Sequence, residues 1–220
     1  MGIRYSKVEG KFQREIVLLK SFPCAYGKCS FCNYIEDNSN DEEEINRVNL
    51  EVLEKITGEF GVLEVINSGS VFEIPKKTLE KIREVVYEKD IKILYFEIFY
   101  SYLSRLNEII DYFNEKKKVE IRFRTGIESF DNDFRRKVYN KNIFLDEKKI
   151  KELSENDKIE AILKKTSKIL ISAKMTIRDS IIGTARGPFG EKGADIHMLS
   201  LTEKEMDICR MKRYTAVIVY

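Results

Sequence analysis

The chain has 220 residues, which is enough for one α/β domain and short for two. Hydrophobic residues make up 43% and charged residues 35%, so a core can form, while the apolar runs are far too short to span a membrane. The 39 basic and 37 acidic side chains nearly cancel, which argues against a dedicated nucleic-acid or membrane-surface binder and favours a small-molecule ligand. Because residues 1–12 lack the apolar stretch of a signal peptide, we expect a cytoplasmic protein. From the chain length we expect a single domain over residues 1–220.

The first 142 residues alternate short apolar runs with amphipathic segments. The runs at 15–20, 62–66, 91–96 and 119–123 have the length of buried strands. A helix is predicted after Asn40 or Asp41, either of which can cap its acidic first turn, and Pro75 suits the first turn of another. Apolar residues at helical spacing mark three helices: Ile45, Val48, Val52, Leu53 and Ile56; Leu79, Ile82, Val85 and Val86; and Leu103, Leu106, Ile109, Ile110 and Phe113. Four βα repeats predict an α/β fold with a parallel sheet, closed or partly closed, and helices outside it.

The pattern is weaker over residues 143–220. We expect a helix over 146–165, strands at 169–172 and 216–219, and a loop over the glycine-rich segment 184–194. No repeat or low-complexity linker marks a second domain.

Three of the four cysteines, Cys24, Cys29 and Cys32, fall within nine residues of the loop after the first predicted strand. In a reducing compartment such a C-x4-C-x2-C cluster indicates metal ligation or redox chemistry rather than disulfides. A zinc site would need a fourth ligand, for which Cys209 or His197 is available. A two-iron cluster of the plant ferredoxin type would need a nearby fourth cysteine, which the chain lacks, and buried structural thiols are a further alternative. The remaining interpretation is a four-iron cluster on three thiolates, with one iron open.

This segment resembles the radical S-adenosylmethionine enzymes, whose hallmark is a three-cysteine loop after the first strand of a full or partial (βα) barrel. The usual spacing in that family is C-x3-C-x2-C, and this chain has one residue more between Cys24 and Cys29. Phe31, directly before the last cysteine, and Tyr34, two residues after it, are typical of the loop. The resemblance implies a partial barrel of the (βα)6 type, a 4Fe-4S cluster on the three thiolates, and S-adenosylmethionine (SAM) bound at the open iron.

In a parallel barrel the ligand site lies at the carboxyl ends of the strands, so the loops there are expected to supply it. Asn67, Ser68, Gly69 and Ser70 form a small polar turn where the family carries a glycine-rich motif against the methionine amino group. After the fourth strand, Glu128 and Ser129 belong to a segment similar to the family's G-x-E-S motif near the ribose and methionyl groups. Taken singly, Ser68 and Ser70 also suit a turn and a helix cap, and an acidic side chain at a strand end is commonly just exposed.

Three segments look like a branch of these enzymes that includes enzymes of deazaguanine metabolism: FPCAYGKCSFCNY, NSGSVFEIPKKTLEKI and RTGIESFDNDFRRKVYNK. The short length and the C-x4-C-x2-C loop look most like the queuine lyases, a family within that branch. That family cleaves the free base queuine and returns its aminomethyl-deazaguanine precursor. The resemblance implies that electron transfer from the cluster cleaves SAM to a 5′-deoxyadenosyl radical, that this radical abstracts hydrogen from the substrate, and that C–N cleavage follows. It also implies a small deazaguanine base as substrate and an external reductant of the flavodoxin or ferredoxin type.

Substrate-binding residues are predicted from the chemistry of such a base. A guanine-like edge offers donors that carboxylates accept, and a diol needs polar partners. The predicted residues are Glu36, Glu73, Tyr95, Glu97 and Tyr100, and core packing is the alternative for Tyr95. A modest basic patch is also present, for which a solvated helix face is the ordinary explanation, and it comprises Arg122, Arg124, Arg135, Arg136 and Lys137.

Two other functions stay open on the sequence. One is a radical enzyme that acts on tRNA or on another small molecule, and a tRNA enzyme would bind nucleic acid with a clear salt dependence. The other is a non-catalytic zinc or iron–sulfur binding module. No role is predicted for His197, and Cys209 is expected to be a buried structural thiol.

Overall fold

A computed structural model describes residues 4–10, 12–30, 32, 34–128, 132–146, 148, 159–163 and 214–216. The chain forms two compact units. The first comprises Met1–Gly27 and Tyr34–Phe123, and the second comprises Lys28–Asn33 and Arg124–Tyr220.

The first unit is built on a sheet in which strands that are neighbours in sequence are also neighbours in space. Its strands are β1 (Tyr5–Val8), β2 (Arg14–Leu19), β3 (Val62–Asn67), β4 (Ile93–Glu97) and the beginning of β5 (Glu120–Glu128). β2, β3 and β4 pair in parallel, with Val17 opposite Val65 and Val65 opposite Phe96. The predicted α/β class with parallel strands is therefore confirmed, and β5 extends five residues beyond its predicted end at Phe123.

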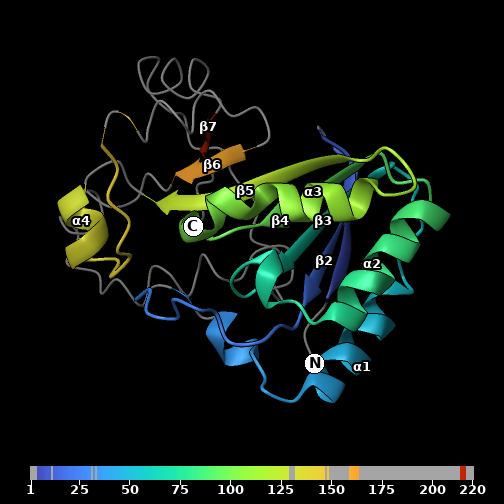
Figure 1. The fold of residues 1–220 in the computed structure, drawn as a ribbon, viewed down its shortest axis with the longest axis horizontal. Coiled ribbons are helices and arrows are strands. Elements are labelled where there is room, and N and C mark those ends of the chain that lie inside the picture. The colour runs from blue at the N-terminus through green and yellow to red at the C-terminus, as the bar shows by residue number, and fades with distance from the viewer. Residues whose placement is uncertain are drawn as a thin grey trace. The chain divides into compact units, whose positions relative to one another are not determined.

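Helices connect these strands and lie along one face of the sheet (Figure 1). They are α1 (Glu42–Leu53), α2 (Lys76–Glu88) and α3 (Leu106–Asn114), and three short 3-10 turns precede them: η1 (Tyr34–Asp37), η2 (Val71–Glu73) and η3 (Tyr100–Arg105). The predicted cap of the first helix is correct, because the Asp41 side chain accepts hydrogen bonds from the N–H groups of Glu43 and Glu44. Leu103, which was expected on the third helix, lies in η3 instead.

The core of this unit lies between the helices and the covered sheet face. Leu63 and Val65 of β3 and Leu94 and Phe96 of β4 are fully buried there. Phe96 packs against Phe113 of α3, with their ring centroids 5.3 Å apart. Burying aromatic side chains of this size removes a large apolar area from water, which holds the helix layer on the sheet.

β1 is an element that the sequence analysis does not predict. It pairs antiparallel with β2, with Tyr5 opposite Val17 and Val8 opposite Arg14. The strand expected first in the chain is therefore the second strand of the sheet and the first of its parallel strands. Four residues of mixed polarity carry too weak a pattern to predict a strand, and β1 depends on the partner strand beside it.

Glu15 is a fully buried carboxylate at the start of β2. One oxygen accepts from the Tyr5 hydroxyl at 2.7 Å and from the Thr57 N–H at 2.8 Å, and the other accepts from the Gly58 N–H at 2.7 Å. Burial acts to raise the pKa of the Glu15 carboxyl, but the hydrogen bonds outweigh burial and lower it. Since the folded-state pKa lies below the unfolded one, this carboxylate stabilises the fold above a pH of about 4.3, and the contribution is lost as pH falls through the folded-state pKa.

We therefore predict that Glu15→Gln lowers the free energy of unfolding by about 2 to 3 kcal/mol at neutral pH, because the amide nitrogen would face an N–H donor in the place of one oxygen. Urea unfolding at pH 7 and pH 4 measures this loss, which should shrink at the lower pH. Glu59→Gln is the matched control, since Glu59 is exposed and forms an ion pair with Lys7 at the surface. Equal stability of Glu15→Gln and the wild type would contradict the prediction.

The second unit contains the end of β5, the helix α4 (Asn132–Lys137), β6 (Ile159–Leu163) and β7 (Tyr214–Ala216). β6 and β7 pair in parallel, with Ile162 opposite Thr215. The helix expected over 146–165 is therefore wrong at 159–163, because a short apolar run such as IEAIL suits a strand and a helix equally well. The segments 169–172 and 184–194 lie outside the described residues, and β7 begins two residues before the strand expected at 216–219.

The expected explanation of the basic segment, a solvated helix face, is wrong for Arg135. Its side chain is fully buried, and Nε donates to the Ile143 carbonyl at 2.8 Å while Nη2 donates to Asn132. Arg136 and Lys137 of the same helix are exposed. Arg135 is thus a structural residue of the second unit and contributes nothing to a basic surface.

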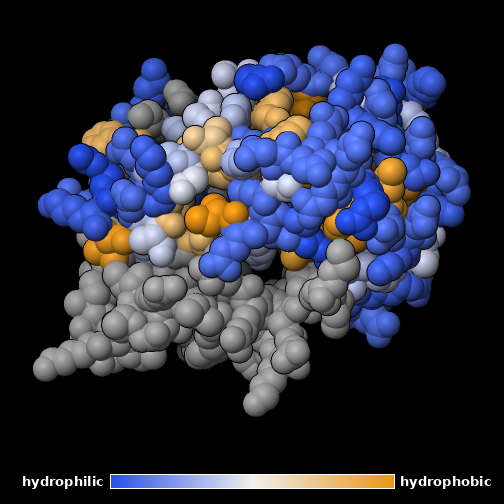
Figure 2. Space-filling view, turned by 90° about the horizontal axis from the view of Figure 1, so that it is seen from below, coloured by the Kyte–Doolittle hydropathy of each residue, from blue (hydrophilic) through white to orange (hydrophobic). Residues whose placement is uncertain are grey.

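The surface of the described residues is largely polar. Figure 2 shows a face that is mostly hydrophilic, with hydrophobic side chains in small groups. The large hydrophobic side chains that are exposed are Phe12, Ile35 and Phe144. Among the helices that the structure describes, none combines the length and the apolar character needed to cross a bilayer.

Candidate active site

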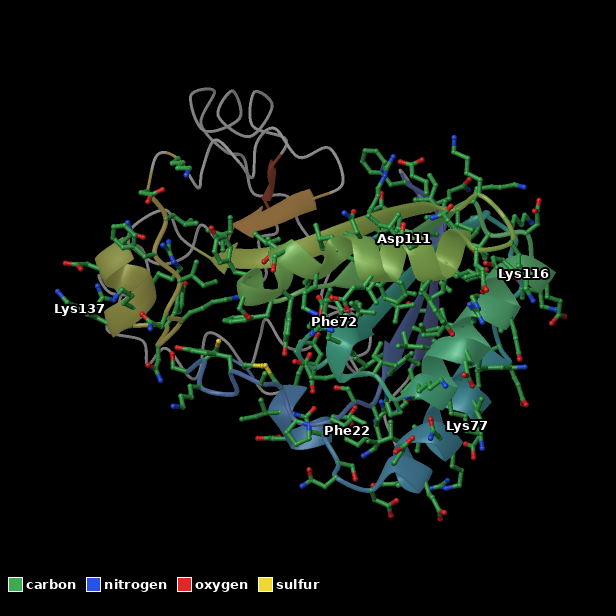
Figure 3. All side chains as sticks on the ribbon, viewed as in Figure 1. Phe22, Phe72, Lys77, Asp111, Lys116 and Lys137 are labelled. Atoms are coloured by element: carbon green, nitrogen blue, oxygen red, sulfur yellow. The ribbon has the colours of Figure 1, made fainter. Side chains whose placement is uncertain are left out.

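Polar turns follow the parallel strands of the first unit at their carboxyl ends, where ligands bind in parallel α/β sheets. Figure 3 labels Phe22, which follows β2, and Phe72 of η2, which follows β3, and both lie at this end of the sheet. Asn49 of α1 fixes the end of β2, since its side chain accepts from the Lys20 N–H at 2.8 Å and donates to the Lys20 carbonyl at 2.9 Å. The first cysteine comes four residues later.

Cys24 is a half-buried thiol in the first unit. The Gly27 N–H donates to its Sγ at 3.5 Å. Gly69 lies against its backbone, since a Cβ placed on Gly69 would be 3.2 Å from the Cβ and 3.3 Å from the Cα of Cys24. Gly69 also has a φ of +130°, a conformation that only glycine adopts readily. The turn after β3 and the first cysteine are therefore packed together, as the sequence predicts for neighbouring strand ends.

Cys29 and Cys32 are half-buried thiols that belong to the second unit. The N–H of Cys32 donates to the Cys29 carbonyl at 3.2 Å, which closes a turn between them. Ser30 holds this turn, because its N–H donates to the Tyr139 carbonyl and its hydroxyl to the Val138 carbonyl. Among the described residues no three His, Cys, Asp or Glu side chains are gathered as metal ligands, so joint ligation by the three cysteines stays a prediction.

The turn from Asn67 to Ser70 is buried and highly ordered by hydrogen bonds. The Ser68 hydroxyl donates to the Asn38 side chain, and the Ser21 hydroxyl donates to the Ser68 carbonyl at 3.1 Å. Asn67 donates from Nδ2 to the Ser70 carbonyl at 2.9 Å, but its Oδ1, also buried, has no partner in the described part of the chain. A buried acceptor without a donor is costly, so this oxygen is suited to a donor group from a ligand.

Glu73, predicted as a substrate contact, lies beneath this turn with 7% of its surface exposed. Its carboxylate accepts from the Ser70 N–H at 2.6 Å and from the Tyr102 hydroxyl at 3.0 Å, and the nearby backbone N–H of Ala25 favours its charged form. Burial raises the pKa of the Glu73 carboxyl, although these hydrogen bonds oppose the shift. Burial and the neighbouring Glu73 likewise raise the pKa of Tyr102. A substrate contact through Glu73 stays a prediction.

The other predicted substrate residues are spread over three elements. Tyr95 and Glu97 lie on β4, and Tyr100 begins η3. The Tyr95 ring is buried, and its hydroxyl accepts a hydrogen bond from Arg122 of β5 at 2.7 Å. Glu36 is exposed in η1. The structure thus brings Tyr95, Glu97 and Tyr100 onto one strand and its following turn, with Glu36 on a separate turn.

Several residues around this rim are not predicted from the sequence. Asn38 and Ser21 bind the Ser68 hydroxyl and carbonyl, and Tyr102 binds Glu73. The Tyr26 ring, from the cysteine loop, stacks on Phe99 with their centroids 5.1 Å apart. The tyrosine-rich run at 95–102 was a usable signal for aromatic contacts, whereas nothing in the sequence marks Asn38 or Ser21.

Some predicted site residues lie outside the described part of the chain. Phe31 and Ser129 are among them, and only the backbone of Glu128 is described. His197 and Cys209, for which no site role is predicted, lie outside the described residues as well. Glu128 is the last residue of β5 rather than part of a loop after it. Tyr34 is described and begins η1.

The chemistry of the donors fits the predicted cofactors. Thiolates are the ligands that iron–sulfur clusters take, and three of them in nine residues leave one iron of a four-iron cluster open. The unpaired Oδ1 of Asn67 is an acceptor suited to an ammonium group such as that of SAM. The residues present therefore suit both groups.

Comparison with known proteins identifies one informative relative. No protein-family model matches the chain, and no curated protein matches it either. Among solved structures, the chain is similar to a queuine lyase from Clostridium spiroforme bound to SAM and queuine. The two share 36% sequence identity and a TM-score of 0.70, and the match covers 99% of this chain and 96% of the other. It confirms the predicted fold class, an α/β fold of the partial-barrel type. This chain therefore belongs to the queuine lyase family of radical SAM enzymes.

Proposed function

We propose that the protein is a queuine lyase that cleaves the C–N bond of queuine and returns the aminomethyl-deazaguanine base. The observation that carries this proposal is the 36% identity over 99% of the chain to a queuine lyase bound to SAM and queuine. The C-x4-C-x2-C segment and the polar turn after β3 support it, because both occur at the strand ends where such a site is built.

In this proposal Cys24, Cys29 and Cys32 hold a 4Fe-4S cluster. When bound, the cluster and SAM together supply a 5′-deoxyadenosyl radical, which is the hydrogen-abstracting species of this family. The turn from Asn67 to Ser70 would bind the methionyl part of SAM, with Asn67 Oδ1 accepting from its ammonium group. Phe31, Tyr34, Glu128 and Ser129 complete the proposed SAM-binding set.

The remaining task of the protein is to hold the base and exclude water. A primary alkyl radical reacts with whatever lies nearest, so the substrate must be fixed by several groups at once. We assign this role to Tyr95 and Glu97 on β4, to Tyr100 on η3 and to Glu36 on η1. Arg122 fixes the Tyr95 hydroxyl, so that this ring has a defined position before a ligand arrives.

The partners follow from the same chemistry. A free base rather than tRNA is favoured by the near-neutral charge and by the burial of Arg135, which removes one cation from the expected basic patch. An external reductant of the flavodoxin or ferredoxin type would supply the electron. We also propose a cytoplasmic location, where such reductants act.

The test is anaerobic reconstitution with iron and sulfide, followed by reduction in the presence of SAM and queuine. We expect mass spectrometry to detect 5′-deoxyadenosine and the aminomethyl-deazaguanine base together, and neither product when SAM or the reductant is omitted. Formation of 5′-deoxyadenosine without cleavage of queuine would reject the substrate and leave the family assignment intact.

A second reaction in the same experiment separates the free base from tRNA. Queuosine-containing tRNA should yield no aminomethyl-deazaguanine base, and a gel-shift titration at low salt should show no specific tRNA complex. A product from tRNA but none from queuine would favour the tRNA-modifying alternative.

A further inference from the structure

Glu73 contacts the backbone on both sides of Cys24. Its main-chain carbonyl accepts from the Phe22 N–H at 3.0 Å, and the Ala25 N–H lies near its carboxylate and favours the charged form. Phe22 and Ala25 flank Pro23 and Cys24 directly. One hydrogen bond and one electrostatic contact with a single residue of η2 therefore bracket the dipeptide that carries the first cysteine.

The carboxylate of Glu73 is itself held in place. The Ser70 N–H and the Tyr102 hydroxyl donate to different oxygens of the carboxylate, and the side chain is almost completely buried. The Glu73 carboxylate and the Ser70 hydroxyl also form a reciprocal capping box around η2. Because three elements converge on one acceptor group, its position relative to the β3 turn is fixed before any cofactor binds.

Gly69 packs against both Glu73 and Cys24. A Cβ on Gly69 would lie 3.1 Å from Oε2 of Glu73 and 3.2 Å from the Cβ of Cys24, so the glycine backbone packs against both residues. Cys24 is thus bounded by the contacts of Glu73 with its chain neighbours and by close packing from Gly69. The Tyr102 hydroxyl donates to Glu73 from outside the β3 turn and the cysteine loop.

We propose that Glu73 is the positioning residue for Cys24, fixing the backbone of this cluster ligand through Phe22 and Ala25. The inference rests on the proposed function for the identity of the cluster, but the geometry that it invokes exists in the chain alone. Groups that orient metal ligands commonly change metal affinity strongly when they are lost. Glu73 therefore acts on the cluster without touching it.

Hydrogen exchange in the wild-type chain before reconstitution tests the geometry directly. The amides of Phe22 and Ser70 should exchange about tenfold or more slowly than their intrinsic rates, because each donates to Glu73. Resolved by NMR on the full chain, exchange of the Phe22 and Ser70 amides at intrinsic rates would overturn the proposal whatever any variant does.

Two full-length variants then test the consequence for the cluster. Glu73→Leu keeps most of the volume and removes both acceptor oxygens, whereas Tyr102→Phe removes only one donor hydroxyl. At limiting iron we expect about a tenfold loss of cluster occupancy in Glu73→Leu, an altered EPR spectrum of the reduced cluster, and wild-type behaviour in Tyr102→Phe. Circular dichroism of both chains before reconstitution separates this effect from a failure to fold.

The outcomes distinguish the two proposals. A folded Glu73→Leu chain with the iron content and EPR spectrum of the wild type would overturn the positioning role and leave the lyase assignment standing. A wild-type chain that assembles a cluster but does not cleave queuine would reject the lyase assignment and leave the positioning role testable by the same EPR comparison. If Glu73→Leu does not fold, the hydrogen-exchange result decides.

Discussion

Replacing Cys24 with serine is expected to abolish cluster assembly and to reduce 5′-deoxyadenosine formation to background. A serine hydroxyl stays protonated at neutral pH and is a hard oxygen donor, whereas iron–sulfur clusters require soft thiolates. With only Cys29 and Cys32 left, two irons would lack a protein ligand. The measurement is iron and sulfide content after anaerobic reconstitution, together with 5′-deoxyadenosine yield in the presence of SAM.

Cys209→Ser is the matched control for this experiment. Cys209 stands outside the C-x4-C-x2-C segment, so its loss should leave iron content and 5′-deoxyadenosine yield at wild-type levels. A zinc site built from the three clustered cysteines and Cys209 would give a different pattern, since Cys24→Ser and Cys209→Ser would both lose the metal. Full iron content in Cys24→Ser would contradict the cluster assignment.

Gly69→Ala is expected to destabilise the protein and to displace Cys24. At a φ of +130° any side chain is strained, which costs about 1 to 3 kcal/mol. The added methyl group would also lie closer than ordinary van der Waals contact to Oε2 of Glu73 and to the Cβ and Cα of Cys24. Backbone atoms cannot retreat as the end of a flexible side chain can, so the cysteine must shift. Urea unfolding and cluster content measure the two effects.

Gly61→Ala separates backbone strain from the displacement of the cysteine. Gly61 also has a positive φ, of +63°, but an added Cβ would meet only the Lys92 side chain, at 3.7 Å. This variant should lose about 1 kcal/mol of stability and keep its full cluster content. Equal cluster content in Gly69→Ala and Gly61→Ala would show that the close approach of Gly69 to Cys24 has no consequence for the site.

Much of the first unit can be predicted from its sequence because the signals are local. Asp41 and the acidic turn after it mark the start of α1, and the apolar runs that become β2, β3 and β4 are short and well bounded. β1 was missed because its stability depends on pairing with β2, and β6 was mistaken for helix because its five residues have no periodicity of their own. The elements that are predicted wrongly are those whose structure depends on pairing with a neighbouring strand.

The candidate site, like the fold, can be predicted from the sequence only in part. The order of the polar turns along the rim follows from the strand order, and so the Asn67 to Ser70 turn and the cysteine loop could be placed in advance. The hydrogen bonds of Glu73 could not, because they join Phe22, Ser70 and Tyr102, which are far apart in the chain. The burial of Arg135 could not be predicted for the same reason, since it depends on the Ile143 carbonyl.

The antiparallel strand β1 has a consequence for how chains meet one another. Without it, β2 would present an unpaired row of N–H and carbonyl groups, which is a template for pairing with a strand of another molecule. With it, the sheet ends at a strand of only four residues that carries Lys7, and a charge on a short edge discourages intermolecular pairing. The N-terminal strand thus protects the protein against edge-to-edge aggregation.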